Sequence, residues 1–184
     1  MLSKGLMMGL IFITGIAGSG KTTLLKELRS RGCKVYDADE KLSFWANKLN
    51  GEKISASDHT LTTNPNFFDK HDWYIDKLGV KKLAEEAANK TTFICGSVAN
   101  EKDVWNYFEI VFCLYIDDNL LIKRIKNRDD KDFGKSEHEL AHLLKLNQNV
   151  QPKYKSLGAT IIDATQPTEI IADDIIAAIK QTKY

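Results

Sequence analysis

Short apolar runs alternate with longer segments of helical periodicity along most of the chain. Five of these runs are short and rich in β-branched and aromatic residues, and they predict buried strands at residues 10–14, 34–39, 91–96, 110–116 and 159–163. Strands that are almost continuously apolar and alternate with helices are typical of a parallel sheet covered on both faces. The pattern therefore predicts an α/β fold.

Helices are expected between these strands, where apolar residues recur every three or four positions. The predicted helices cover residues 21–31, 76–89 and 118–127, a segment that begins at Ser136, and residues 167–179. Ser136 and Glu139 have the spacing of a capping box, and we expect the helix that they open to end or kink at Pro152. Residues 43–75 have the least regular pattern and read as a long loop followed by an aromatic group, "FFDKHDWY".

The composition is that of an ordinary globular protein. The chain has 184 residues, 43% of them hydrophobic and 28% charged, with a net charge of +1. This balance argues against a nucleic-acid partner or an anionic membrane surface, and no run approaches the roughly 20 apolar residues of a membrane span. Two of the three cysteines, Cys95 and Cys113, lie in apolar runs, so we expect buried thiols, a reducing compartment and a cytoplasmic protein.

The segment "GIAGSGKTT", residues 15–23, follows the first predicted strand and opens the first predicted helix. Gly15, Gly20, Lys21 and Thr22 fit the pattern G-x-x-x-x-G-K-[ST] of a Walker A phosphate-binding loop (P-loop). Glycines let the backbone turn with positive φ so that consecutive N–H groups face an anion, and the helix N-terminus adds further donors.

This loop predicts a site for ATP and Mg²⁺. Lys21 is expected to reach the terminal phosphates and the Thr22 hydroxyl to ligate Mg²⁺. The alternative is a simple glycine turn with a solvated lysine. The residues expected to hold the nucleotide in this loop are Gly15, Ala17, Gly18, Ser19, Gly20, Lys21, Thr22 and Thr23.

Two carboxylates follow the second predicted strand, in "YDADE". Asp37 and Asp39 are expected to share one side if the strand persists, at the sheet edge where doubly wound folds bind ligands. One of them would take a proton from an acceptor hydroxyl or, in the case of Asp37, help hold Mg²⁺. The alternative is a strand-end turn in which an aspartate caps a helix.

Arg124 and Arg128 lie four residues apart on a predicted helix, just before a short polar segment that contains Gly134. Arginines that close over the transferring phosphoryl group from a hinged lid would stabilise its charge, so both are candidate catalytic residues. The alternative is a pair of solvated arginines on an amphipathic helix.

Two further groups are candidates for binding the acceptor. Gly96 and Ser97 follow the third predicted strand, where a small residue permits close approach of a substrate. The alternative there is a strand-to-helix turn with Asn100 as the cap. His71 and Trp73 would line an acceptor pocket, or instead anchor the insertion to the core through aromatic packing.

The order of these features resembles that of small-molecule kinases of the nucleoside monophosphate kinase and shikimate kinase group, and "KVYDADE" is similar to the "DAD" segment of dephospho-coenzyme A kinases. The resemblance implies a three-layer P-loop fold with five parallel strands in the order 2-3-1-4-5. It also implies that the loop from Ala164 to Gln166, which contains Thr165, lies near the adenine, and that Arg124 and Arg128 serve the lid.

From the sequence we expect a single kinase domain over residues 1–184, with an acceptor-binding insertion at about 40–80 and a short lid at about 128–136. Its acceptor would be a small hydroxylated molecule such as a nucleoside or nucleotide, and the protein a monomer or homodimer. The alternative function is a nucleotide-binding regulatory ATPase without a small acceptor. The third predicted strand ends in Cys95 and Gly96, rather than in the acidic residues of such ATPases.

Overall fold

The structure, a computed structural model, describes residues 8–54, 62, 64–129 and 133–181. Its centre is a parallel sheet of five strands in the order β2-β5-β1-β6-β7. These strands are β1 (Gly9–Thr14), β2 (Lys34–Asp37), β5 (Thr91–Cys95), β6 (Ile110–Tyr115) and β7 (Thr160–Asp163). Counted among themselves, they run 2-3-1-4-5, so the predicted fold class and the implied strand order are confirmed.

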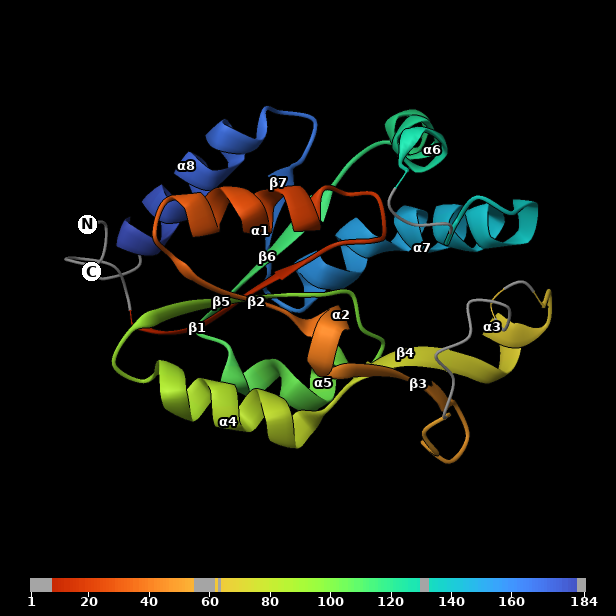
Figure 1. Cartoon of the computed structure of the whole chain (residues 1–184), viewed down its shortest axis with the longest axis horizontal. Helices are drawn as coiled ribbons and strands as arrows, with labels where there is room; N and C mark the ends of the chain where they lie inside the picture. Colours follow the sequence, from red (N-terminus) through yellow and green to blue (C-terminus); the bar gives the residue numbers. More distant parts are fainter. Residues whose placement is uncertain (1–7, 55–61, 63, 130–132, 182–184) are drawn as a thin grey trace.

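Helices cover both faces of this sheet. Figure 1 shows α1 (Lys21–Ser30) beside α8 (Thr168–Gln181) on one side and α4 (Lys77–Ala87) on the other. The remaining helices of the main body are α5 (Glu101–Val104), the 3₁₀ helix η1 (Trp105–Tyr107), α6 (Asp118–Asn127) and α7 (Glu137–Ser156). Every residue of β1 is buried, because β1 has neighbours on both edges and helices on both faces.

The region around residues 43–75 is more regular than the sequence predicted. Strands β3 (Ser43–Asn47) and β4 (His71–Ile75) pair antiparallel as a separate two-stranded sheet, and the short helix α3 (Phe67–Lys70) leads into β4. We call these three elements the β3–β4 hairpin. Figure 1 shows the hairpin extending away from the main sheet toward the side on which α7 lies.

Two other local predictions were wrong. The second strand ends at Asp37 rather than at residue 39, because the Asp37 side chain accepts a hydrogen bond from the backbone N–H of Asp39 and caps the short helix α2 (Ala38–Lys41). Asp39 therefore lies on a helix and does not share a strand face with Asp37. Of the two outcomes expected at Pro152, an end or a kink, the end is wrong, because α7 continues through Pro152 to Ser156.

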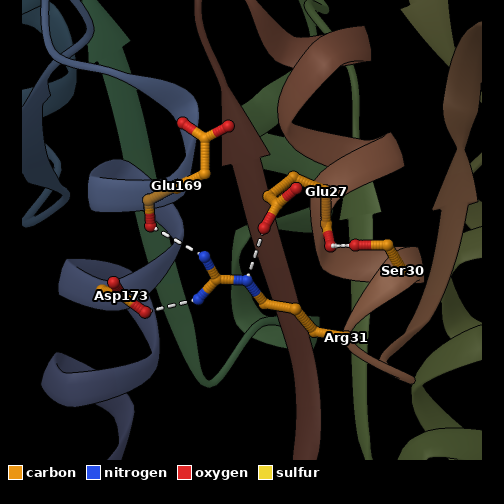
Figure 2. Close-up of polar contacts among 5 residues, drawn as sticks. All are labelled: Glu27, Ser30, Arg31, Glu169 and Asp173. Carbon is orange, nitrogen blue, oxygen red and sulfur yellow. Dashed lines mark hydrogen bonds and ion pairs between the residues drawn. The ribbon is translucent and has the colours of Figure 1, made fainter.

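The C-terminal end of α1 is fastened to α8 by one arginine. The Arg31 guanidinium donates through Nε to Glu27 Oε1 at 2.7 Å, through Nη1 to Asp173 Oδ1, and through Nη2 to the Glu169 carbonyl at 2.9 Å (Figure 2). The carboxylates of Glu27 and Asp173 raise the pKa of Arg31, chiefly through these hydrogen bonds. The contact fixes the helix that begins in the glycine loop.

The thiols behave as predicted. Cys95 and Cys113 are buried, and burial raises the pKa of each to about 12, so neither is a thiolate at neutral pH. Within the described residues, no helix has the length and apolar character needed to cross a bilayer.

Candidate active site

The loop between β1 and α1 has the conformation expected of an anion nest. Gly15, Gly18 and Gly20 have φ values of 145°, 87° and 103°, which side-chain-bearing residues rarely adopt. Gly20 is left-handed at the N-cap of α1, with no side-chain capping bond, and the first turn of α1 contains no acidic residue. The N–H groups of that turn and the positive end of the helix dipole are therefore available to an anion.

Two glycines of the loop also allow close packing that a side chain would prevent. A Cβ at Gly15 would lie 2.7 Å from both the Leu114 carbonyl oxygen and Ser19 Oγ. A Cβ at Gly18 would lie 2.9 Å from Leu121 Cδ1 on α6, with Ile125 almost as close. The strand and helix on the far side thus hold the loop in its tight curve.

The Lys21 ammonium lies over this loop. Its Nζ donates to the carbonyl oxygens of Gly15 at 2.7 Å and of Ile16 at 2.8 Å. Burial is the main reason why the pKa of Cys95 is raised. The positive charge of Lys21 lowers this pKa, and the carboxylates of Asp37 and Asp39 raise it. Asp37, which pairs with Cys95 in the sheet, therefore lies at the same end of β5 that is near Lys21 and Asp39.

The other loop residues predicted to hold the nucleotide differ in their exposure to solvent. Thr22 and Thr23 are exposed on the first turn of α1, whereas Ala17 is half-buried against the core. Ser19 is 1% exposed, and its Oγ has no hydrogen-bond partner among the described residues. A buried hydroxyl without a partner in a loop of three positive-φ glycines fits a phosphate-bearing ligand such as ATP.

Mg²⁺ fits the residue types present near the loop. The exposed Thr22 hydroxyl and the half-buried Asp37 carboxylate are oxygen ligands of the kind that Mg²⁺ takes alongside phosphate oxygens. Within the described residues, no cluster of three or more His, Cys, Asp or Glu side chains forms a ready-made metal site.

Arg124 joins the glycine loop to the loop after β7. Its Nη1 donates to the Ser19 carbonyl at 3.1 Å, and its Nη2 donates to the Ala164 carbonyl at 2.8 Å. Partial burial lowers the pKa of Arg124 from its usual value, and the group remains a cation at neutral pH. The guanidinium thus stands at the junction of the two segments predicted to hold ATP.

The loop that contains Thr165 is ordered by Asp163. The Thr165 N–H donates to Asp163 Oδ1 at 2.9 Å, and this bond is the main reason why the pKa of Asp163 is lowered. Ala164 is buried and Thr165 is exposed. Because Arg124 holds Ala164, the position of Thr165 is fixed relative to the glycine loop.

Asp37 ends β2 at the same edge of the main sheet as the glycine loop. The register pairs Asp37 with Cys95 and Cys95 with Ile13, so Asp37 is two strands away from β1. At the usual strand spacing this is about 10 Å, a gap that a transferred phosphoryl group and its acceptor would span. One Asp37 oxygen caps α2, which is the alternative role expected for an aspartate at this strand end.

Asp39 and Trp73, both predicted to bind the acceptor, are in direct contact. Trp73 Nε1 donates to Asp39 Oδ1 at 2.9 Å, which joins α2 to β4. The Trp73 ring also meets the Trp45 ring edge-on, at a centroid distance of 5.1 Å. Trp73 therefore anchors the β3–β4 hairpin and orients a carboxylate at once.

His71 lies two residues farther out on β4. Its ring packs against Phe67 at a centroid distance of 4.6 Å, and its Nδ1 is 3.1 Å from the Phe67 carbonyl oxygen. These contacts favour the packing interpretation for His71. The structure does not bring it into contact with Asp39.

The structure gives its own reason for a glycine at position 96, which is the close approach of Ala38. A Cβ at Gly96 would lie 2.9 Å from Ala38 Cβ, so the small residue admits helix α2 at that point. Ser97 follows it and is half-buried. Asn100 does not cap α5 with its side chain, because the amide bonds both the N–H and the carbonyl of Ile75 on β4, at 2.8 and 3.1 Å.

Arg128 stands at the C-terminal end of α6, where the lid was predicted. Its Nη2 donates to the Phe133 carbonyl oxygen. Residues 130–132 of the predicted lid lie outside the described part of the chain. Beyond them, the Gly134 N–H and the Ser136 hydroxyl both donate to Glu139 Oε2, which tethers this segment to the start of α7.

The acidic residues after β6 have structural roles. Asp117 caps α6 by accepting from the Leu120 N–H, and Asp118 Oδ1 accepts from Asn147 Nδ2 on α7.

The sequence interpretation noted the aromatic group "FFDKHDWY" but missed its packing with Trp45 and Phe133. Trp45, Phe67 and Phe68 form the packed interior of the β3–β4 hairpin, and Phe133 approaches it from the lid side. The period-two pattern of "SFWAN", paired with "HDWYI", is the signal that predicts such a hairpin.

Comparison with known proteins agrees with this geometry. A family model described as "AAA domain" matches residues 11–145. No curated protein matches the chain.

Solved structures share the fold at low sequence identity. Shikimate kinase from Acinetobacter baumannii in complex with shikimate superposes with a TM-score of 0.64 at 19% identity, covering 96% of this chain and 95% of that one. Deoxyadenosine kinase from M. mycoides with bound dATP gives 0.57 at 16% identity, covering 92% and 98%. A gluconokinase from Sinorhizobium meliloti 1021 gives 0.52 at 13%, covering 95% and 93%.

Proposed function

Since this chain belongs to the AAA domain family and has the fold of P-loop small-molecule kinases, we propose that it is a kinase that transfers a phosphoryl group from ATP to a small hydroxylated acceptor. The observation that carries the proposal is the arrangement around the glycine loop. Lys21 lies over three glycines of positive φ, and the carboxylates of Asp37 and Asp39 approach the neighbouring strand end.

The nucleotide side of the mechanism is positioning and charge stabilisation. The loop N–H groups and Lys21 would bind the phosphates, Arg124 would hold the two nucleotide-binding segments together, and Arg128 would add positive charge from the lid side. Thr22 and Asp37 would hold Mg²⁺, which neutralises part of the phosphate charge when bound.

The acceptor side requires a carboxylate near the incoming hydroxyl. Asp37 or Asp39 would accept the hydroxyl proton as the new oxygen–phosphorus bond forms. The Trp73 indole holds Asp39 in place, so the aromatic wall of the β3–β4 hairpin and this carboxylate would contact the same acceptor. The candidate acceptors are nucleosides, nucleotides and other hydroxylated metabolites.

The test is acceptor-dependent turnover of ATP. Purified protein with ATP and Mg²⁺ is incubated with a panel of nucleosides, nucleotides, sugars and hydroxy acids, and both ADP and phosphorylated product are measured. Lys21→Ala should lose at least about 100-fold in rate, while Lys26→Ala, at an exposed position of the same helix, should retain wild-type turnover. Wild-type turnover in Lys21→Ala would refute the mechanism.

The second candidate function is a nucleotide-binding regulatory ATPase, since the description of the matching family, "AAA domain", names no acceptor. It makes the opposite prediction in the same assay. ATP hydrolysis at one rate with every acceptor, and no phosphorylated product, would support the regulatory ATPase over the kinase.

A further inference from the structure

Phe68 joins the β3–β4 hairpin to the lid side of the nucleotide site. A second contact lies beside it, where the Thr62 carbonyl oxygen, between β3 and β4, is 2.6 Å from His138 Nε2 on α7. Phe68 is 7% exposed, and its ring stacks flat on His142 of α7, with centroids 4.0 Å apart and planes 6° from parallel. The same ring meets Phe133 at 6.1 Å in an edge contact. Phe68 therefore lies in the segment predicted to bind the acceptor, while its ring contacts residues on the lid side.

Phe133 is also the residue that holds Arg128, through its carbonyl oxygen. The segment that follows is fixed tightly, because Gly134 is buried, its N–H donates to Glu139 Oε2 at 3.0 Å, and a Cβ there would lie 2.7 Å from Leu143 Cδ1. Phe68 therefore packs on a residue that joins the arginine to the start of α7.

On its other side, Phe68 is connected to the acceptor carboxylate. Its ring lies 6.1 Å from that of Trp45, which contacts Trp73, and Trp73 donates to Asp39. Aromatic rings in contact resist independent movement because separating them exposes apolar surface and opens a void. Asp39 and Arg128 are thus the two ends of a continuous packed row.

We propose that Phe68 is a positioning residue for Arg128: by packing on Phe133 and His142, it makes the β3–β4 hairpin and the arginine move as one unit. An acceptor that binds against the hairpin would then also fix the position of Arg128, the arginine proposed to stabilise the transferred phosphoryl group. The catalytic part of this inference rests on the proposed kinase function, whereas the mechanical part does not.

The chain supplies a matched control in the adjacent residue. Phe67 is of the same type and is 5% exposed, but its ring contacts are with Trp45, Phe68 and His71, all within the hairpin. Phe68→Leu and Phe67→Leu remove similar buried area, so they differ mainly in the contact with Phe133 and His142. If Phe68→Leu does not fold, His142→Ala at a half-exposed position breaks the same contact, and His142→Phe keeps a stacked ring.

The first measurement is hydrogen exchange at the buried Gly134 amide. Phe68→Leu should speed its exchange about tenfold, and Phe67→Leu should leave it at the wild-type rate. The second is steady-state kinetics, in which Phe68→Leu should lower kcat about tenfold with little change in the KM for ATP, and His142→Phe should retain kcat.

Each outcome decides the proposal. Equal Gly134 exchange in the two phenylalanine variants would overturn it, whether or not the protein is a kinase. Faster exchange in Phe68→Leu with an unchanged kcat would confirm the contact but overturn its role in positioning Arg128. If the wild-type protein transfers no phosphoryl group, the kinase function fails, and the exchange comparison alone then decides whether the two segments move as one.

Discussion

The guanidinium of Arg124 bonds the carbonyl oxygen of Ser19, a residue 105 positions earlier in the chain, at 3.1 Å. The same guanidinium bonds the Ala164 carbonyl, so one side chain fixes the distance between the glycine loop and the loop that follows β7. A nucleotide that occupies both loops would therefore find them already aligned.

Arg124→Lys should weaken nucleotide binding about tenfold or more, because a lysine keeps the charge but lacks the planar fork that reaches both carbonyl groups. Isothermal titration with a non-hydrolysable ATP analogue measures the effect. Arg29→Lys, at an exposed position on α1, is the control and should leave the affinity unchanged. An Arg124→Lys affinity within twofold of wild type would contradict the alignment role.

Trp73→Phe should raise the KM for the acceptor by about tenfold and leave the KM for ATP unchanged. The substitution keeps an aromatic ring but removes the donor to Asp39, and a hydrogen bond to a charged group contributes about 1.5–3 kcal/mol. Trp105→Phe, on η1, is the matched control and should affect neither KM. Equal effects on the two substrates would place Trp73 outside the acceptor site.

Gly96→Ala should lower turnover through α2, because the new Cβ would lie 2.9 Å from Ala38 Cβ and displace the helix that carries Asp39. Adding Ala38→Gly reopens the space, so the double variant should recover most of the lost kcat. Ala38→Gly alone costs about 1 kcal/mol of stability for a glycine within a helix and serves as the control. Failure of the double variant to recover would show that Gly96 faces the substrate instead.

Arg31→Ala should destabilise the fold without changing the chemistry. Of the three bonds that Arg31 donates, those to Asp173 and to the Glu169 carbonyl join α1 to α8 at a partly exposed position (Figure 2), so we expect a loss of about 1 kcal/mol and a fall in Tm of about 2–4 °C. Differential scanning calorimetry measures it, and Arg29→Ala is the control on the same helix. An unchanged Tm would show that the contact contributes nothing net.

His142 should make stability depend on pH in the mildly acidic range. Burial lowers the pKa of His142, and the nearby Lys48 and Lys145 lower it further, against the opposing effect of Asp72 and Asp69. The unfolded chain then takes up the proton first, so stability is complete above about pH 6.5 and falls as the pH drops toward the folded-state value. Measured between pH 8 and pH 5.5, the Tm of His142→Phe should fall less than that of wild type; an equal fall would assign the effect to other groups.

The main sheet and the glycine loop could be predicted because their signals are local. A buried strand such as β1 must be apolar throughout, and the loop glycines must adopt positive φ, so both leave a direct mark on the sequence. Arg124 was recognised from its spacing, although its two carbonyl partners depend on strands and loops far away in the chain.

The boundaries at the acceptor side could not be predicted because they depend on tertiary contacts. Whether the chain continues as a strand after Asp37 is decided by the cap on α2 and by the space that Gly96 leaves for Ala38. The hairpin is likewise stabilised by contacts between rings from separate segments, such as Trp45 and Trp73, and the intervening polar stretch obscured its pattern.

The edge-on pair of Trp45 and Trp73 has a practical consequence for anyone who studies this protein. Two of the three tryptophans in the chain lie in the hairpin, 5.1 Å apart, so the intrinsic emission of the native protein originates largely from the segment that is proposed to meet the acceptor. Quenching or a spectral shift on adding a compound would therefore report its arrival without any label.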